Sequence, residues 1–359
     1  MPPPALYGKR HREIANSLWR IVAEDRLPQT LLFAGPEGVG KATLARHLAA
    51  GINCDLGPCE PCGDCSACRR ILAADLSLES FKRQLAERRK LPAAKRAEAP
   101  LVIATYTDVL IFPPDGPMQI IGIDQAITLR NAARLSPSEG RRRIFIIEHA
   151  ERANAEAANA LLKTLEEPAP NLTIVLTSEN PYLLPATIRS RSVPFFLPAL
   201  TRDEMAAFLE RRQDIGEEVR EQVATWSQGS PGVALSLDAE EFLRRRDTML
   251  ALLDTALSRG EFAQLIGKLD KIARRESEGI EALAVMIASL LRDLLRLHLG
   301  VDENLTHRDI RDELERLASG ISFEWTARAI EALDELEQMR QRNIQKQIAL
   351  EAYALALQR

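Results

Sequence analysis

The chain has 359 residues, of which 46% are hydrophobic and 27% charged. This length and composition allow two or three globular domains with buried cores, and they exclude a disordered tail or a fibre. The formal net charge of -4 excludes the strongly basic surface of a protein that holds DNA by itself, so DNA contacts would depend on partners.

The amino end and the later apolar stretches argue against a membrane protein. Residues 1–13 contain prolines and basic residues but no apolar signal core. No later stretch reaches the roughly eighteen uncharged apolar residues that a membrane span requires. We therefore expect a cytoplasmic protein that makes no membrane contact.

A glycine-rich loop follows the first predicted strand. Residues 31–33 are apolar, and the loop that follows has the form G-x-x-x-x-G-K before a helical pattern at 42–50. Such a loop surrounds phosphates with backbone N–H groups, and its lysine reaches the terminal phosphates. The candidate nucleotide-binding residues are Gly35, Gly38, Gly40, Lys41 and Thr43.

All five cysteines fall within the next segment, between residues 54 and 68. Cys54, Cys62, Cys65 and Cys68 have the spacing C-x7-C-x2-C-x2-C, and four such thiolates can close a tetrahedron around zinc. A reducing cytosol favours metal ligation over disulfides, and a closed set of four sulfurs predicts structural Zn2+. Cys59 lies inside the first gap, which leaves open whether it replaces Cys54.

Strands and helices alternate up to residue 198. Apolar segments 144–147 and 172–176 read as buried strands, with a helix between them that begins near Asn154 and is stopped by Pro168. This alternation predicts an α/β fold with a doubly wound parallel sheet. The segment 82–99 is rich in charge and is interpreted as a solvated helix or insertion.

The rest of the chain is predicted to be helical. Thr201 and Glu204 have the spacing of a capping box that opens a helix. One apolar stripe ends at Gly300 and consists of Leu283, Met286, Ile287, Leu290, Leu291, Leu294 and Leu297. A second stripe is predicted to begin with Ile330, Leu333 and Leu336.

The phosphate loop lacks groups that ATP hydrolysis needs. Ala42 stands where a hydroxyl normally binds magnesium, and Thr43 lies about a hundred degrees further round the helix. After the strand at 144–147, where an Asp and a Glu are expected, the chain has Glu148 and His149. These departures predict a site that can retain ATP or ADP through Lys41 but does not hydrolyse it.

Several motifs resemble, in chain order, the bacterial DNA polymerase III clamp-loader family. They are Ile121-Gly-Ile-Asp-Gln125, Asn159-Ala-Leu-Leu-Lys-Thr-Leu-Glu-Glu-Pro168, Thr187-Ile-Arg-Ser-Arg191, Gly229-Ser-Pro-Gly232 and Ile348-Ala-Leu-Glu351. The resemblance implies an AAA+ P-loop domain at 1–198, with a zinc module at 54–68 and a charged insertion near 76–104. It further implies a helical lid at 199–240 and an all-α collar for oligomerisation at 241–359.

Two branches of this family carry both the loop and the zinc module. The gamma/tau motor branch would have a hydroxyl at 42, an acidic pair at 148–149 and an arginine after Gly229-Ser230. Here Pro231-Gly232-Val233 follows instead, so the chain resembles the non-hydrolysing delta-prime branch. The position of the family's first cysteine favours Cys54 over Cys59 as a zinc ligand.

In this family, an arginine of a Ser-Arg-Cys motif reaches a neighbouring subunit's ATP. The corresponding residues are Ser190, Arg191 and Ser192, which implies that Arg191 acts as an arginine finger in trans. The alternative is an ordinary exposed or ion-paired arginine. The implied partners are the gamma/tau motor subunits, the delta subunit and, through the complex, the sliding clamp and primer-template DNA.

The residues argue against two alternative functions. An active AAA+ ATPase of the gamma/tau or helicase-loader type disagrees with Ala42, His149 and the missing lid arginine. A zinc-dependent DNA-binding module disagrees with the acidic charge balance and the closed ligand set.

Overall fold

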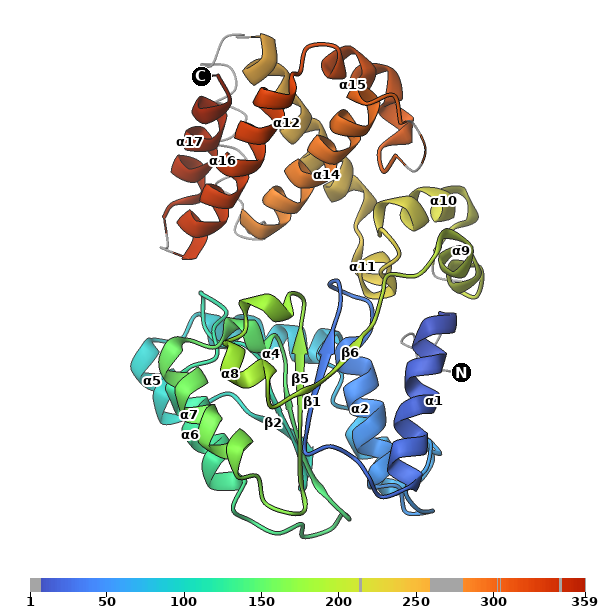
Figure 1. Cartoon of the computed structure of the whole chain (residues 1–359), viewed down its shortest axis with the longest axis vertical. Coiled ribbons are helices and arrows are strands. Elements are labelled where there is room, and N and C mark those ends of the chain that lie inside the picture. Colours follow the sequence, from blue (N-terminus) through green and yellow to red (C-terminus); the bar gives the residue numbers. More distant parts are fainter. Residues whose placement is uncertain are drawn as a thin grey trace. The chain divides into compact units, whose positions relative to one another are not determined.

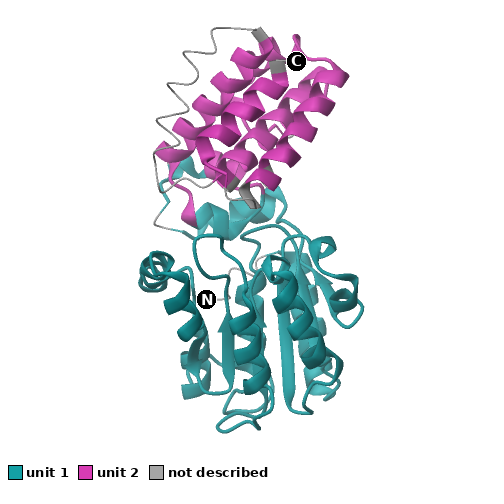
Figure 2. Ribbon diagram, turned by 90° about the vertical axis from the view of Figure 1, so that its left-hand side faces the viewer, with its two compact units in different colours: residues 1–220, 229–235 teal, residues 221–228, 236–359 magenta. Residues whose placement is uncertain are grey.

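The computed structural model describes residues 8–212, 215–258, 280–301, 303, 305–341 and 344–358. The chain divides into two compact units, one of Met1–Arg220 with Gly229–Leu235 and the other of Glu221–Gln228 with Ser236–Arg359 (Figure 2). The predicted domain boundaries at 198 and 240 stay a prediction, because the residues between them are divided between the units. None of the described helices is both long enough and apolar enough to cross a membrane.

The first unit is built on a six-stranded sheet (Figure 1). The order of its strands is β2-β3-β4-β5-β1-β6. Its strands are β1 (Thr30–Ala34), β2 (Ile103–Tyr106), β3 (Val109–Phe112), β4 (Arg143–Ile147), β5 (Leu172–Ser178) and β6 (Val193–Phe196). All neighbours pair in parallel except β2, which is antiparallel to β3 at the edge. The predicted α/β fold is confirmed, with an antiparallel edge strand that the prediction lacked.

Helices cover both faces of this sheet because successive side chains of each strand point to opposite sides. Leu31 and Phe33 of β1 pack in a core with α1 (Lys9–Ala23) and α2 (Lys41–Ile52). Leu32, between them, packs in a second core on the opposite face. That core contains residues of α6 (Ile123–Ala132) and α7 (Ala155–Glu166).

The remaining helices of the first unit are short. They are α3 (Ser66–Leu72), α4 (Glu79–Arg89), α5 (Ala93–Glu98), η2 (Ala150–Arg152), η3 (Pro181–Leu183), α8 (Ala186–Arg189), α9 (Arg202–Glu210) and α11 (Pro231–Ser236), while α10 (Glu217–Trp226) is divided between the units. The capping box is confirmed, since Glu204 N donates to Thr201 Oγ1 and Thr201 N donates to Glu204 Oε2. The charged insertion forms α4 and α5, neither of which has a buried residue.

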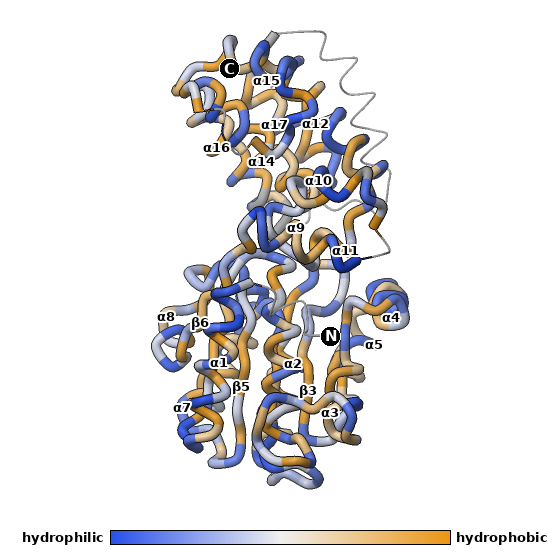
Figure 3. The backbone as a smooth tube through the Cα atoms, turned by 90° about the vertical axis from the view of Figure 1, so that its right-hand side faces the viewer, coloured by the Kyte–Doolittle hydropathy of each residue, from blue (hydrophilic) through white to orange (hydrophobic). Residues whose placement is uncertain are grey.

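The described part of the second unit is helical. It contains α12 (Ala239–Ser258), α14 (Ile280–His298), η4 (Arg308–Ile310), α15 (Arg311–Ala318), α16 (Phe323–Gln341) and α17 (Lys346–Gln358), whose alternating hydropathy can be followed in Figure 3. Residues 259–279 of the predicted collar lie outside the described residues.

The two predicted apolar stripes had different outcomes. The stripe on α14 is confirmed: six of its members are buried and Leu297 packs against the same core. Gly300, two residues after the end of this helix, has a left-handed backbone with φ 72°. The second stripe was wrong at Ile330, which is 48% exposed. Leu336 is buried and Leu333 packs against the same core, as predicted. The other buried apolar residues of α16 are Trp325, Ala329 and Ala332, which sequence reasoning missed because small alanines give a weak hydrophobic signal.

A buried carboxylate ties the turn before β3 to the loop that precedes β4. Asp108 is fully buried and accepts backbone N–H hydrogen bonds from Ser138, Glu139 and Gly140 at 2.8 to 3.0 Å. Burial raises the pKa of Asp108, but these donors and the Arg143 guanidinium outweigh burial and hold that pKa below its usual range. The ionised form of Asp108 therefore stabilises the fold.

We expect Asp108→Asn to lower the free energy of unfolding by about 2–3 kcal/mol at neutral pH, because charge-assisted hydrogen bonds are lost. Since the folded pKa is depressed, the difference from wild type should be constant above about pH 4 and shrink as the pH falls through the folded pKa. Urea unfolding at several pH values measures this difference in the free energy of unfolding. The exposed Glu13→Gln variant is the control, and equal stability of Asp108→Asn at pH 7 would contradict the assignment.

Candidate functional site

The glycine loop between β1 and α2 has a backbone that only glycine adopts readily. Gly35, Gly38 and Gly40 have φ of 153°, 71° and 103°. A Cβ on Gly35 would lie 2.1 Å from Leu197 O, and a Cβ on Gly38 would lie 2.7 Å from Val233 N. Two of the glycines therefore allow close packing against neighbouring backbone.

The loop lysine contacts its own loop. Lys41 is buried, and its Nζ donates to the carbonyl oxygens of Gly35 and Pro36, both at 2.7 Å. Burial lowers the pKa of Lys41, while the carboxylates of Glu179 and Glu151 oppose the change. Gly35, Gly38, Gly40 and Lys41 are thus brought together as one loop with an internally bonded lysine.

The start of α2 offers no oxygen in the place where magnesium would bind. Ala42 has none, and Thr43 Oγ1 accepts a hydrogen bond from Arg46 Nη2 at 3.4 Å. Arg46 also pairs with Asp75 Oδ1 at 3.0 Å. The Thr43 hydroxyl is therefore hydrogen-bonded to the buried Arg46.

The carboxyl end of β4 carries Glu148 and His149. Glu148 is buried, and burial raises its pKa although Arg46 and His149 oppose the change. His149 has a left-handed backbone with φ 51° and ψ 55°, and its N–H donates to Thr177 Oγ1 at 3.1 Å. A non-glycine residue in this conformation is strained by about 1–2 kcal/mol, and such strain clusters at functional sites.

Two glutamates that sequence reasoning missed face His149. The imidazole Nδ1 lies 3.1 Å from Glu179 Oε1 and 3.7 Å from Glu151 Oε1. Burial lowers the pKa of His149, but the two carboxylates outweigh burial and raise it to about 9. The one signal in the sequence is that both glutamates follow the ends of buried strands, where parallel sheets gather functional side chains.

Arg191 lies in the turn between α8 and β6. Its guanidinium pairs with Glu166 Oε1 at 2.8 Å and donates to Thr187 O at 3.0 Å. The Arg191 side chain is 37% exposed, whereas the next residue, Ser192, is buried and donates to Ile188 O at 2.8 Å. The turn is therefore anchored, and the guanidinium remains accessible at its edge.

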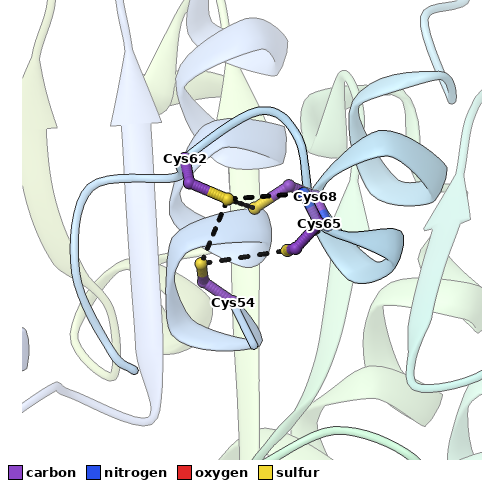
Figure 4. Close-up of side chains that lie close together, drawn as sticks. All are labelled: Cys54, Cys62, Cys65 and Cys68. Carbon is purple, nitrogen blue, oxygen red and sulfur yellow. Dashed lines mark hydrogen bonds between the residues drawn. The ribbon is translucent and has the colours of Figure 1, made fainter. Parts of the chain in front are cut away.

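Four of the five cysteines form a compact cluster (Figure 4). Sγ of Cys54 lies 3.7 Å from that of Cys62 and 3.9 Å from that of Cys65, and Cys62 Sγ lies 4.0 Å from Cys68 Sγ. Sulfurs bound about 2.3 Å from a tetrahedral zinc ion lie about 3.8 Å apart, so the spacing fits this metal.

The chain around the cysteine cluster also suits thiolate ligands. The N–H groups of Cys65 and Cys68 donate to Sγ of Cys62 and Cys65, both at 3.4 Å, as expected where negative charge on sulfur is stabilised. Cys59 is exposed and lies outside the cluster. The donor set therefore fits a closed structural site without Cys59.

The start of α11, within the predicted lid, contacts the phosphate loop. Gly232 N donates to Gly38 O at 2.8 Å, at the start of α11. The residues Pro231, Gly232 and Val233 at this contact include no arginine. This segment therefore offers backbone, and no cationic side chain, to the loop.

Known proteins of bacterial DNA replication match this chain. The family model described as "DNA polymerase III, delta subunit" matches residues 10–201, and the model described as "DNA polymerase III, delta subunit, C terminal" matches residues 240–359. The chain is 26% identical to DNA polymerase III subunit delta' of Bacillus subtilis, with 96% of this chain and 95% of that protein covered.

Other matches are to a longer protein and to a solved structure. Identity to DNA polymerase III subunit tau of Bacillus subtilis is 26% and covers 80% of this chain, but the chain spans only 47% of that protein. A solved DNA polymerase III gamma subunit-related protein of Thermotoga maritima is 19% identical, with a TM-score of 0.42 and coverage of 96% of this chain and 98% of that one.

We expect Gly38→Ala to destabilise the first unit by about 2 kcal/mol or more, since it adds left-handed strain and a clash with α11 backbone. Gly300→Ala is the matched control, because Gly300 has a similar φ of 72° with nothing within 4 Å of its Cβ position. Thermal unfolding measures the stability lost in each variant. The control reports the backbone strain alone, and any larger loss in Gly38→Ala reports the clash with α11. Equal losses would mean that the Gly38 contact with α11 contributes nothing.

Proposed function

Because the chain belongs to the DNA polymerase III delta-subunit family, we propose that it is a delta-prime subunit of a bacterial clamp loader that does not hydrolyse ATP. The match to a delta' protein over nearly its full length supports this assignment. The chain would act in the cytoplasm by completing a neighbouring motor subunit's ATPase site during loading of the sliding clamp.

The absence of hydrolysis is supported by the chemistry of the loop. Magnesium would find neither a hydroxyl at Ala42 nor a readily ionised carboxylate at Glu148, whose pKa is raised by burial. His149 is no carboxylate, and Glu151 and Glu179 raise the pKa of its imidazole to about 9, so at neutral pH it is protonated and cannot accept a proton from water. Binding of ATP or ADP without hydrolysis stays compatible with this role.

The proposed role in a neighbour's ATPase site depends on the accessible guanidinium of Arg191. A guanidinium at a subunit boundary stabilises the charge that develops on a transferred phosphoryl group. The Arg191 side chain is accessible, and Glu166 and Thr187 hold it in one place before any partner binds. Glu166 would be exchanged for the neighbour's phosphate when the two subunits meet.

The partners follow from this role. The gamma/tau motor would supply ATP to Arg191, and the delta subunit would complete the ring. The sliding clamp and the primer-template DNA would be engaged through the complex, in agreement with the net charge of -4.

Structural zinc would be held by Cys54, Cys62, Cys65 and Cys68. Zinc closes a short loop that has little core of its own, and it would keep α3 attached to the end of α2. Cys68 is fully buried and packs with Cys54 in the core beside α2, so the cluster is continuous with the folded unit. The metal would contribute stability and no chemistry.

We expect Arg191→Ala to reduce ATP-driven clamp loading by a reconstituted complex about a thousandfold, the lower end of the effect of an arginine finger. Subunit assembly, measured by size-exclusion chromatography, should be unchanged. Arg189→Ala, which removes a neighbouring arginine that stacks on Tyr182, is the matched control.

Unchanged loading by the Arg191→Ala complex would contradict the proposed role. Magnesium-dependent phosphate release by the isolated wild-type chain would instead favour the alternative, an active ATPase of the gamma/tau or helicase-loader type.

We expect Cys62→Ser to remove bound zinc and to lower the melting temperature of the first unit, because three remaining thiolates cannot close the tetrahedron. Cys59→Ser should keep one zinc ion per chain and the wild-type melting temperature. Metal analysis of protein purified without chelator measures the zinc content. Equal zinc content in the two variants would rule out this ligand set.

A further inference from the structure

A second group of metal-ligating side chains lies at the carboxyl ends of β4 and β5, apart from the cysteines. It consists of His149, Glu151 and Glu179, which each offer one ligand atom within 4.8 Å of the others. We propose that these three residues bind a divalent first-row transition-metal ion of the manganese or zinc class. This inference concerns a separate site and does not depend on the proposed clamp-loader role.

The distances fit a shared ion. Nitrogen and oxygen ligands about 2.1 Å from a tetrahedral ion lie about 3.4 Å from each other. His149 Nδ1 lies 3.1 Å from Glu179 Oε1 and 3.7 Å from Glu151 Oε1, on either side of this value. The two carboxylates also pair with the imidazole when it is protonated, so a bound ion would take the place of the proton on Nδ1.

Glu151 provides an independent indication of a ligand. Its side chain is only 8% exposed, yet its Oε2 has no hydrogen-bond partner in the described part of the chain. Leaving a buried carboxylate oxygen unpaired is unfavourable unless a cation compensates it. The nearby cation of the loop is already engaged, since Lys41 Nζ donates to Gly35 O and Pro36 O.

The backbone holds the three ligands in place before an ion arrives. The N–H of His149 is fixed by Thr177 Oγ1, and Glu179 N donates to Glu151 Oε1 at 3.2 Å. Two adjacent strands, β4 and β5, therefore present the ligands from a rigid sheet edge. The side chains of His149 and Glu179 are about one-third exposed, at 32% and 33%, which leaves a path for the ion.

The donor set selects the class of metal. One imidazole nitrogen with two carboxylates suits manganese, iron or zinc, while magnesium and calcium prefer oxygen ligands alone. Such an ion would neutralise the two carboxylates and cross-link the ends of β4 and β5 beside the phosphate loop. The site would therefore be a structural metal bridge.

The test uses the full chain with its cysteine cluster already filled with zinc, as confirmed by metal analysis. Calorimetric titration with MnCl2, and separately with ZnCl2, should show saturable binding of one further ion. His149→Asn and Glu179→Gln should each weaken this binding about tenfold or more, and asparagine also tolerates the left-handed backbone. Glu156→Gln, an exposed glutamate on α7, is the control and should bind as wild type.

Thermal unfolding provides a second readout. The added ion should raise the melting temperature of the wild type and of Glu156→Gln but not of His149→Asn or Glu179→Gln. The proposal is overturned if neither ion binds saturably, or if both ligand variants bind with wild-type affinity. Because no partner subunit or ATP is involved, these outcomes are distinct from failure of the clamp-loading test.

Discussion

The candidate site at the carboxyl ends of β1, β4 and β5 depends on one constraint, which is the parallel pairing of β5 with both β4 and β1. Register pairs Ala34 with Ser178 and Ile147 with Leu176, so the three strands end side by side. This pairing brings three segments together at the carboxyl edge of the sheet: the phosphate loop, the segment after Ile147 and the segment after Ser178. Every side chain of these strands is buried, which leaves little freedom to shift the register.

At this edge, the charged side chains contact other groups of the protein. Lys41 donates to carbonyl oxygens of its own loop, and His149 faces Glu151 and Glu179. In a hydrolysing site the corresponding groups would be directed at nucleotide and magnesium. The glycine loop therefore binds its own lysine through carbonyl oxygens, while the carboxylates after β4 and β5 face His149.

The two remaining sites are set up by local structure. The cysteine cluster forms where the end of α2 and the start of α3 are joined by a short loop, so few residues are needed to bring four sulfurs together. Arg191 lies in a turn whose backbone is fixed by Ser192 and whose guanidinium is held by Glu166. The cysteine cluster and the accessible Arg191 guanidinium are therefore held by separate parts of the first unit.

The sequence by itself determined the α/β character of the first unit, the capping box at Thr201 and the α14 stripe, because each depends on residues near one another in the chain. The cysteine spacing is similarly local. Long-range pairing decided the rest. The weakly apolar edge strand β2, the alanine-lined face of α16 that leaves Ile330 exposed, and the meeting of His149 with Glu179 depend on packing. The pairing of β2 and the meeting of His149 with Glu179 join residues that no sequence period connects. The face of α16 does follow a helical period, but its alanines give too weak a hydrophobic signal, so only the tertiary structure could place all three.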